Sequence, residues 1–185
     1  MSETPDEELF EELLVLIAEE FTSGGMACEV VPRSDDVVPA QLVMPLGRAT
    51  AGGMELVANV QVFFLPGQID PPVLQYFVAL DVDVPDDALA STALLLHRIN
   101  VVLPVGGFEL SDTAGAVAFR HSQSVTVRPL EPMVVAWPIS MTHYAVTTYA
   151  DVIAAASAGA AATDLIAELD RLAALLLDLP ERSGS

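Results

Sequence analysis

Two long stretches in which apolar and other residues alternate are the strongest folding signal in this chain. In 54–65, one face of an extended strand would carry only apolar side chains: Leu56, Ala58, Val60, Val62 and Phe64. Residues 73–82 repeat the pattern, and Pro66-Gly67 between the two stretches predicts a turn. A period of two over this length is typical of half-buried antiparallel strands. We therefore expect a fold built around an antiparallel sheet.

Helices are expected on both sides of this pair in the sequence. Residues 1–23 predict an N-terminal helix, because Thr4 and Glu7 form a capping box, Pro5 suits the first turn and Gly24-Gly25 ends the segment. Its apolar face is Leu9, Leu13, Leu14, Ile17 and Phe21. A central helix is expected from about residue 85, with Asp86 and Asp87 in its first turn, to about residue 104.

The last third of the chain, 133–179, predicts C-terminal helices. One set of residues follows a helical period: Val134, Trp137, Met141, Tyr144, Thr148 and Val152. Pro138 is then tolerated only if it lies in the first turn. A leucine seam at 4-3-4-3 spacing follows: Leu165, Leu169, Leu172, Leu176 and Leu179. The seam covers only about two heptads, which favours docking on the chain's own sheet over a coiled coil.

The remaining segments complete an α+β architecture. Short strands are expected at 27–31 and 41–44, either of which suits a sheet edge because prolines flank them, and 32–53 otherwise has the composition of a linker. Residues 108–111 and 116–127 predict a hairpin. The order is α-β-β-β-α-β-β-α(α), with a fourth early strand as an alternative. We expect one domain over 1–185, an antiparallel β-sheet packed with helices, with the sheet and central helix in 54–128.

Charge excludes some classes of partner. The chain has 185 residues, 26 of them acidic and seven of them Arg, with no Lys, so its net charge is −19. Such a protein is repelled by nucleic acids and by anionic membranes. No basic, apolar leader and no apolar stretch of about 18 residues is present, so neither secretion nor membrane insertion is expected. The single Cys28 is consistent with a reducing compartment, and we expect a cytoplasmic protein.

Catalytic and metal motifs are weak in this sequence. His97, His121 and His143 show no metal-ligand spacing, and no nucleophile elbow or phosphate loop occurs. The densest carboxylate cluster runs from Asp81 to Asp87, and a divalent-metal protein or enzyme using it is the alternative function. An acid-rich helix start explains the same cluster without a metal. We expect a protein that is not an enzyme and has no cofactor and no metal.

The second face of the sheet is the candidate binding surface. On 54–65 it carries Val57, Asn59, Gln61 and Phe63, and on 73–82 it carries Val73 and Phe77. If helices cover only one side of the sheet, this face is partly apolar and suits a peptide or protein partner. The alternative is that the C-terminal helices cover it.

One part of the chain resembles a known family. The central helix ends in Leu96-His97-Arg98-Ile99-Asn100, Leu103 to Leu110 reads LPVGGFEL, and Val117-Ala118-Phe119-Arg120 follows a turn. An Asn near the end of this helix and a Gly-aromatic strand start resemble the YbjN-like bacterial proteins, which have the type III secretion chaperone-like fold. The resemblance implies a small, acidic, dimeric protein that binds extended segments of a client, with chaperone-like or regulatory function. It implies no particular site residue.

A homodimer is the last expectation from the sequence. The mean hydropathy of +0.50 is high for so acidic a chain. The central helix has apolar residues on nearly every side, and a sheet can cover only one of them. In the secretion chaperones that the chain resembles, this region lies at the dimer interface. The alternative is that the C-terminal helices cover the central helix within one chain.

Overall fold

The computed structural model describes residues 5–34, 39–51, 54–66, 70–126, 130–161, 163–167 and 169. Its elements are α1 (Pro5–Ser23), β1 (Glu29–Val31), β2 (Gln41–Ala51), β3 (Met54–Phe64), β4 (Val73–Asp83), α2 (Leu89–Val102), β5 (Gly107–Leu110), β6 (Ala116–Ser124) and α3 (Pro132–Ser157). All strand pairs are antiparallel, and the six strands are ordered β1-β2-β3-β4-β6-β5. The predicted α+β class is confirmed.

The early strands differ from their prediction. β1 lies at a sheet edge, as its flanking proline suggests, but β2 is an 11-residue strand where a short strand and a linker were expected. β1 pairs only with residues 41–43 of β2. Pro45 therefore lies where β2 has a neighbour on one side only, and the pairing register with β3 shifts between Pro45 and Arg48. An edge position and a bulge are both places where a strand tolerates proline.

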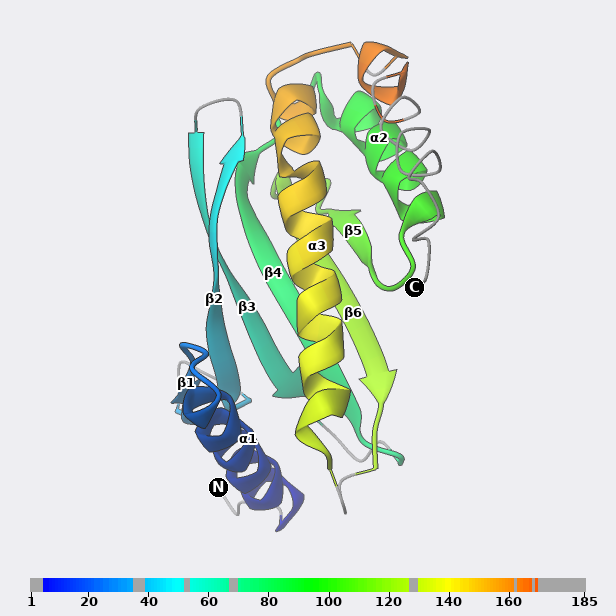
Figure 1. Cartoon of the computed structure of the whole chain (residues 1–185). Coiled ribbons are helices and arrows are strands. Elements are labelled where there is room, and N and C mark those ends of the chain that lie inside the picture. The colour runs from blue at the N-terminus through cyan, green and yellow to red at the C-terminus, as the bar shows by residue number, and fades with distance from the viewer. Residues whose placement is uncertain are drawn as a thin grey trace, which may run out of the picture.

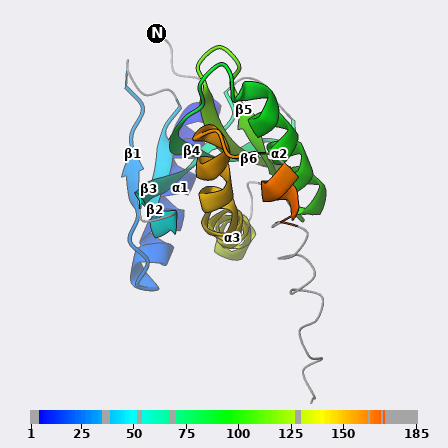
Figure 2. The ribbon, with the colours of Figure 1, turned by 90° about the horizontal axis from the view of Figure 1, so that it is seen from above.

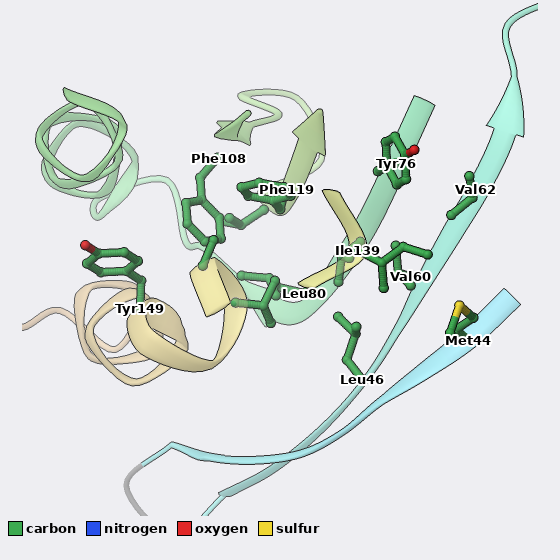
Figure 3. Packing of buried hydrophobic residues seen from close by; sticks show 14 of the residues in the cluster. Met44, Leu46, Val60, Val62, Tyr76, Leu80, Phe108, Phe119, Ile139 and Tyr149 are labelled. Atoms are coloured by element: carbon green, nitrogen blue, oxygen red, sulfur yellow. The ribbon is translucent and has the colours of Figure 1, made fainter. Parts of the chain in front are cut away.

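Helices α1, α2 and α3 lie on one side of the sheet (Figures 1 and 2). α3 crosses the middle of the sheet, α1 lies near β1 and β2, and α2 lies beside β5 and α3. Between these layers is one core, to which the predicted apolar face of 54–65 contributes Val60, Val62 and Phe64 (Figure 3). Phe10 of α1 stacks on Phe64 with ring centroids 4.1 Å apart.

α2 begins later than predicted. It starts at Leu89, so Asp86 and Asp87 lie in the turn before it and not in its first turn. Near its other end, Asn100 holds the edge strand β5 with two hydrogen bonds to Phe108. The Phe108 N–H donates to Asn100 Oδ1 at 2.8 Å, and Asn100 Nδ2 donates to the Phe108 carbonyl at 2.9 Å. One side chain thus satisfies two backbone groups that a strand edge otherwise leaves unpaired.

The helical prediction for α3 is confirmed, but the helix has two apolar sides. Its buried side is Val135, Ile139, Thr142, Val146, Tyr149 and Ile153. The predicted helical set lies mostly on the other side, where Val134, Trp137 and Tyr144 are exposed. A helical period identifies each side but does not decide which of them packs on the sheet.

Pro138 lies within α3 and not in its first turn, which contradicts the prediction, because Pro132 occupies the helix start. A proline in this position removes the N–H that would bond the carbonyl of Val134 four residues earlier. Gln123 of β6 supplies the missing donor, with its Nε2 3.0 Å from the Val134 carbonyl oxygen.

Part of the leucine seam is described. Leu169 is buried in the core and Leu165 packs against it, which agrees with docking on the same chain. The predicted continuation, Leu172, Leu176 and Leu179, lies outside the described residues. None of the described helices is both long enough and apolar enough to cross a membrane.

Candidate functional site

The candidate site is the side of the sheet that faces away from the helices, which we call the open face. Strand pairing places Gln61 of β3 opposite Phe77 of β4, and Phe63 opposite Gln75, so the predicted residues of both strands share this face. Asn59 and Val73 lie on it by the same alternation. Val57 of β3 is paired with Arg48 of β2, and its side chain lies outside the described residues.

Helix α3 does not cover this face. α3 packs on the side of the sheet that carries Val60, Val62 and Tyr76. α3 also contacts α2, so the inner side of α2 is covered within the same chain. On the open face, Phe63, Val73 and Phe77 remain partly accessible, and Asn59 is exposed. Of the two alternatives left by the sequence, the described residues therefore support a sheet that is covered on one side.

Two phenylalanines form the apolar centre of the open face. Because Gln61 pairs with Phe77 and Phe63 pairs with Gln75, the two rings come from diagonal positions of neighbouring strands. Such positions are close enough for aromatic side chains to form one patch. Val73 extends the patch along β4, and Val43 of β2, which pairs with Gln61, extends it sideways.

β6 adds residues that the sequence analysis did not identify. Arg120 pairs with Phe77, and its guanidinium carbon lies 5.7 Å from the Phe77 ring centroid. Its Nη2 is 3.1 Å from Oε2 of Glu109 on β5. The ion pair leaves little net charge beside the ring, while the guanidinium still offers donors to a ligand.

A second polar pair lies next to Phe63. Gln75 Nε2 donates to Ser122 Oγ at 3.1 Å, and the Gln75 side chain is nearly buried although no helix covers it. Parity along 116–124 groups Ala118, Arg120 and Ser122 on one face, which is a usable sequence signal. The sequence alone does not place that face next to Phe77, because β4 pairs with β6 while α2 and β5 lie between these two strands in the chain.

The groups with perturbed pKa values lie on the helix side and not on the open face. Burial raises the pKa of Tyr76 well above its usual value, against a smaller opposing effect of the hydrogen bond from Gln123. Burial lowers the pKa of His121, whose ring centroid is 5.6 Å from that of Tyr76. Burial, with a contribution from Tyr144, also raises the pKa of Tyr149. Each shift has packing as its main cause, and each favours a neutral side chain.

The acidic cluster is dispersed on the surface. Asp81, Asp83, Asp86 and Asp87 are all exposed. Within the part of the chain that the structure describes, no three His, Cys, Asp or Glu side chains lie close enough together to hold a metal ion. His97 and His143 are exposed on different helices, and His121 is half-buried on β6. The three histidines thus belong to separate surroundings.

Comparisons with known proteins find similarity at the level of the fold. A scan against family models finds no match, and a search of curated proteins finds none either. Among solved structures, the fold is similar to the crystal structure of YbjN from E. coli, which is described as a candidate transcription regulator. The two chains share 14% sequence identity with a TM-score of 0.48, over 74% of this chain and 89% of that one.

Proposed function

We propose that this protein is a non-enzymatic binding protein, chaperone-like or regulatory, whose open face holds an extended segment of a partner protein. The observation that carries the proposal is the partly accessible patch of Phe63, Phe77 and Val73 in the middle of a sheet, on the side that no described helix covers. Aromatic side chains that stay accessible without a helix over them mark an interaction surface. The motif resemblance to secretion chaperones implies the same class of function.

The chemistry around the patch suits a peptide. Asn59, Gln61 and Arg120 surround the two rings with hydrogen-bond donors and acceptors that can serve the backbone of a bound segment. Alternate side chains of an extended segment point to one side, so they can reach the patch while the others stay in water. A partner segment with apolar residues at every second position fits this arrangement.

Binding on the face is favoured over strand addition at the β5 edge. The N–H and carbonyl of Phe108, which an added strand would use, are already bonded to Asn100. At the other edge, β1 has only three residues. The open face therefore offers the larger continuous surface.

The test is binding of labelled peptides with alternating apolar residues, selected from a library and measured by fluorescence anisotropy. Phe77→Ala is expected to weaken the selected peptides by about tenfold or more, as loss of a central aromatic contact does. The matched control is Leu94→Ala, which removes an exposed apolar side chain from α2 on the helix side. Equal affinity for Phe77→Ala and the unchanged protein would refute the proposal.

A metal-dependent activity is the rival function, and the same assay addresses it. Binding to the open face should be unchanged when a chelator is added. A loss of binding with chelator, or with Asp81→Asn combined with Asp83→Asn, would instead favour the acidic cluster as the functional site.

A further inference from the structure

The open face carries charged side chains around its aromatic patch, and their arrangement is uneven. By strand pairing and alternation, five charged residues whose side chains are described lie on it: Glu29, Asp81, Asp83, Glu109 and Arg120. All five are exposed. Four of them are acidic, so the surface around the patch is negative.

The positive charge in this set is already neutralised. Arg120 Nη2 lies 3.1 Å from Glu109 Oε2, and the guanidinium lies over the Phe77 ring. Asp81 and Asp83, in contrast, form no ion pair with any other described residue. They stand two residues apart on the same face of β4, about 7 Å along the strand, where two like charges repel each other. A cation beside them would relieve this repulsion.

β4 connects the two aspartates to the aromatic patch. The open-face residues of this strand follow in the order Val73, Gln75, Phe77, Ala79, Asp81 and Asp83. The strand therefore has an apolar end and an acidic end, and Asp81 lies about 13 Å from Phe77 at a rise of about 3.3 Å per residue. Between them, Ala79 and its partner Ala118 on β6 add only methyl groups to the surface.

We propose that the partner segment on the open face runs along β4 and carries a lysine or arginine at the end that lies over Asp81 and Asp83. The inference rests on the proposed function and adds the charge and the polarity of the partner. The segment is apolar over Phe63 and Phe77 and basic about four residues further along, at a position that faces the same side. The apolar stem of a lysine or arginine can lie over Ala79 while its charged group reaches the carboxylates.

The direction along β4 follows from the way extended chains pack on a sheet. In aligned sheet packing, strand directions stay within about 30° of one another. A segment that crossed the strands would instead follow the row Glu29, Val43, Gln61, Phe77 and Arg120. Its basic residue would then lie at Glu29, and the two directions therefore predict different effects of substitution.

The test is a lysine scan of one peptide that binds the open face. A lysine is moved in steps of two residues along an uncharged peptide with alternating apolar residues, and each form is measured by fluorescence anisotropy with a chelator present. Affinity should rise about threefold when the lysine reaches one end of the peptide, and less at the other end, as expected for an exposed ion pair. Glutamate at the favoured position should weaken binding by a similar factor.

Variants of the protein assign the effect of lysine to its site. The net charge of −19 attracts any basic peptide at long range, so the control must change charge equally. Asp81→Asn with Asp83→Asn should remove the preference for lysine and leave the affinity for the uncharged peptide unchanged. Asp86→Asn with Asp87→Asn removes two charges from the turn before α2 and should keep the preference. High salt should reduce the preference, since the groups are exposed.

The outcomes separate this inference from the proposed function. If Phe77→Ala leaves the affinity for the uncharged peptide unchanged, the proposed function is wrong and this inference fails with it. If Phe77→Ala weakens binding but lysine has the same effect at both ends, the proposed polarity alone is wrong. It is also wrong if the preference survives Asp81→Asn with Asp83→Asn, or if Glu29→Gln removes it and the aspartate pair does not.

Discussion

Replacing Gln123 with Ala tests how α3 accommodates a proline inside the helix. Gln123 Nε2 lies 2.9 Å from the hydroxyl oxygen of Tyr76 and 3.0 Å from the carbonyl oxygen of Val134. The second of these is the carbonyl that Pro138 leaves without its helical donor. One amide group therefore connects β6 to a buried side chain of β4 and to the start of α3.

The expected loss follows from the surroundings of each acceptor. Tyr76 is fully buried, so its hydroxyl loses a donor that water cannot easily replace, at a cost of about 1 kcal/mol. Val134 is 43% exposed, so water can reach its carbonyl and the second loss is about 0.5 kcal/mol. Gln123→Ala should lower the free energy of unfolding by about 1.5 kcal/mol in total.

A double-mutant cycle separates the two contributions. Pro138→Ala restores a backbone N–H that can bond the Val134 carbonyl within the helix, so in that background Gln123→Ala should cost only the Tyr76 part, about 1 kcal/mol. Urea unfolding followed by far-UV circular dichroism and by Trp137 fluorescence gives each value. Gln61→Ala is the control, because Gln61 makes no side-chain hydrogen bond to any described residue and should change stability little. An equal cost of Gln123→Ala with Pro138 and with Ala at 138 would refute the account of the helical proline.

Three further predictions concern the fold around the site. Asn100→Ala should cost about 2 kcal/mol, because two backbone groups of the edge strand lose their partners, and amide hydrogen exchange in β5 should become faster. Gly106→Ala should lower the free energy of unfolding by about 2 kcal/mol or more, since Gly106 has φ +68° and a methyl group would lie 2.6 Å from Cζ of Phe119. Gly159 has φ +90° and open space around it, so Gly159→Ala should lower this free energy by only about 1 kcal/mol, as measured by thermal or urea unfolding. Burial lowers the pKa of His121 from its usual 6.5, so the folded protein holds this side chain neutral more strongly than the unfolded chain does. The unfolded chain therefore takes up the proton first as the pH falls below 6.5, and the folded state loses stability. His121→Gln should reduce this loss of stability, measured against the unchanged protein.

Local periodicity is sufficient to predict some elements and insufficient for others. The alternation in 54–65 and 73–82 predicts β3 and β4 and the face of each residue, because one face of each strand is almost purely apolar. It does not predict β2 over most of its length, since Pro45 and Gly47 interrupt the pattern that a strand needs. The two apolar sides of α3 give equally good helical periods, and only the tertiary packing assigns Ile139 to the sheet and Trp137 to the surface.

The open face is partly predictable for the same reason. Parity along two adjacent strands is enough to place Phe63 and Phe77 on the same face of the sheet. Arg120 and Glu109 could not be assigned to that patch, because β6 joins β4 only after the chain has formed α2 and β5. Such long-range pairing depends on the packing of the whole core, and no local signal within 116–124 contains it.

The segment that resembles the YbjN-like proteins has a structural role in this chain. Asn100 fixes the backbone of Phe108, and a Cβ on Gly107 would lie 3.2 Å from the Asn100 side chain, so a larger residue at 107 would displace this side chain by a few tenths of an ångström. Phe108 in turn packs edge-on against Phe119, with ring centroids 5.2 Å apart, and against Tyr149 of α3. These residues join α2, the β5-β6 hairpin and α3 on the helix side of the sheet. The residues that would distinguish one partner from another lie on the open face, around Phe77, and it is there that substitutions should alter binding without altering the fold.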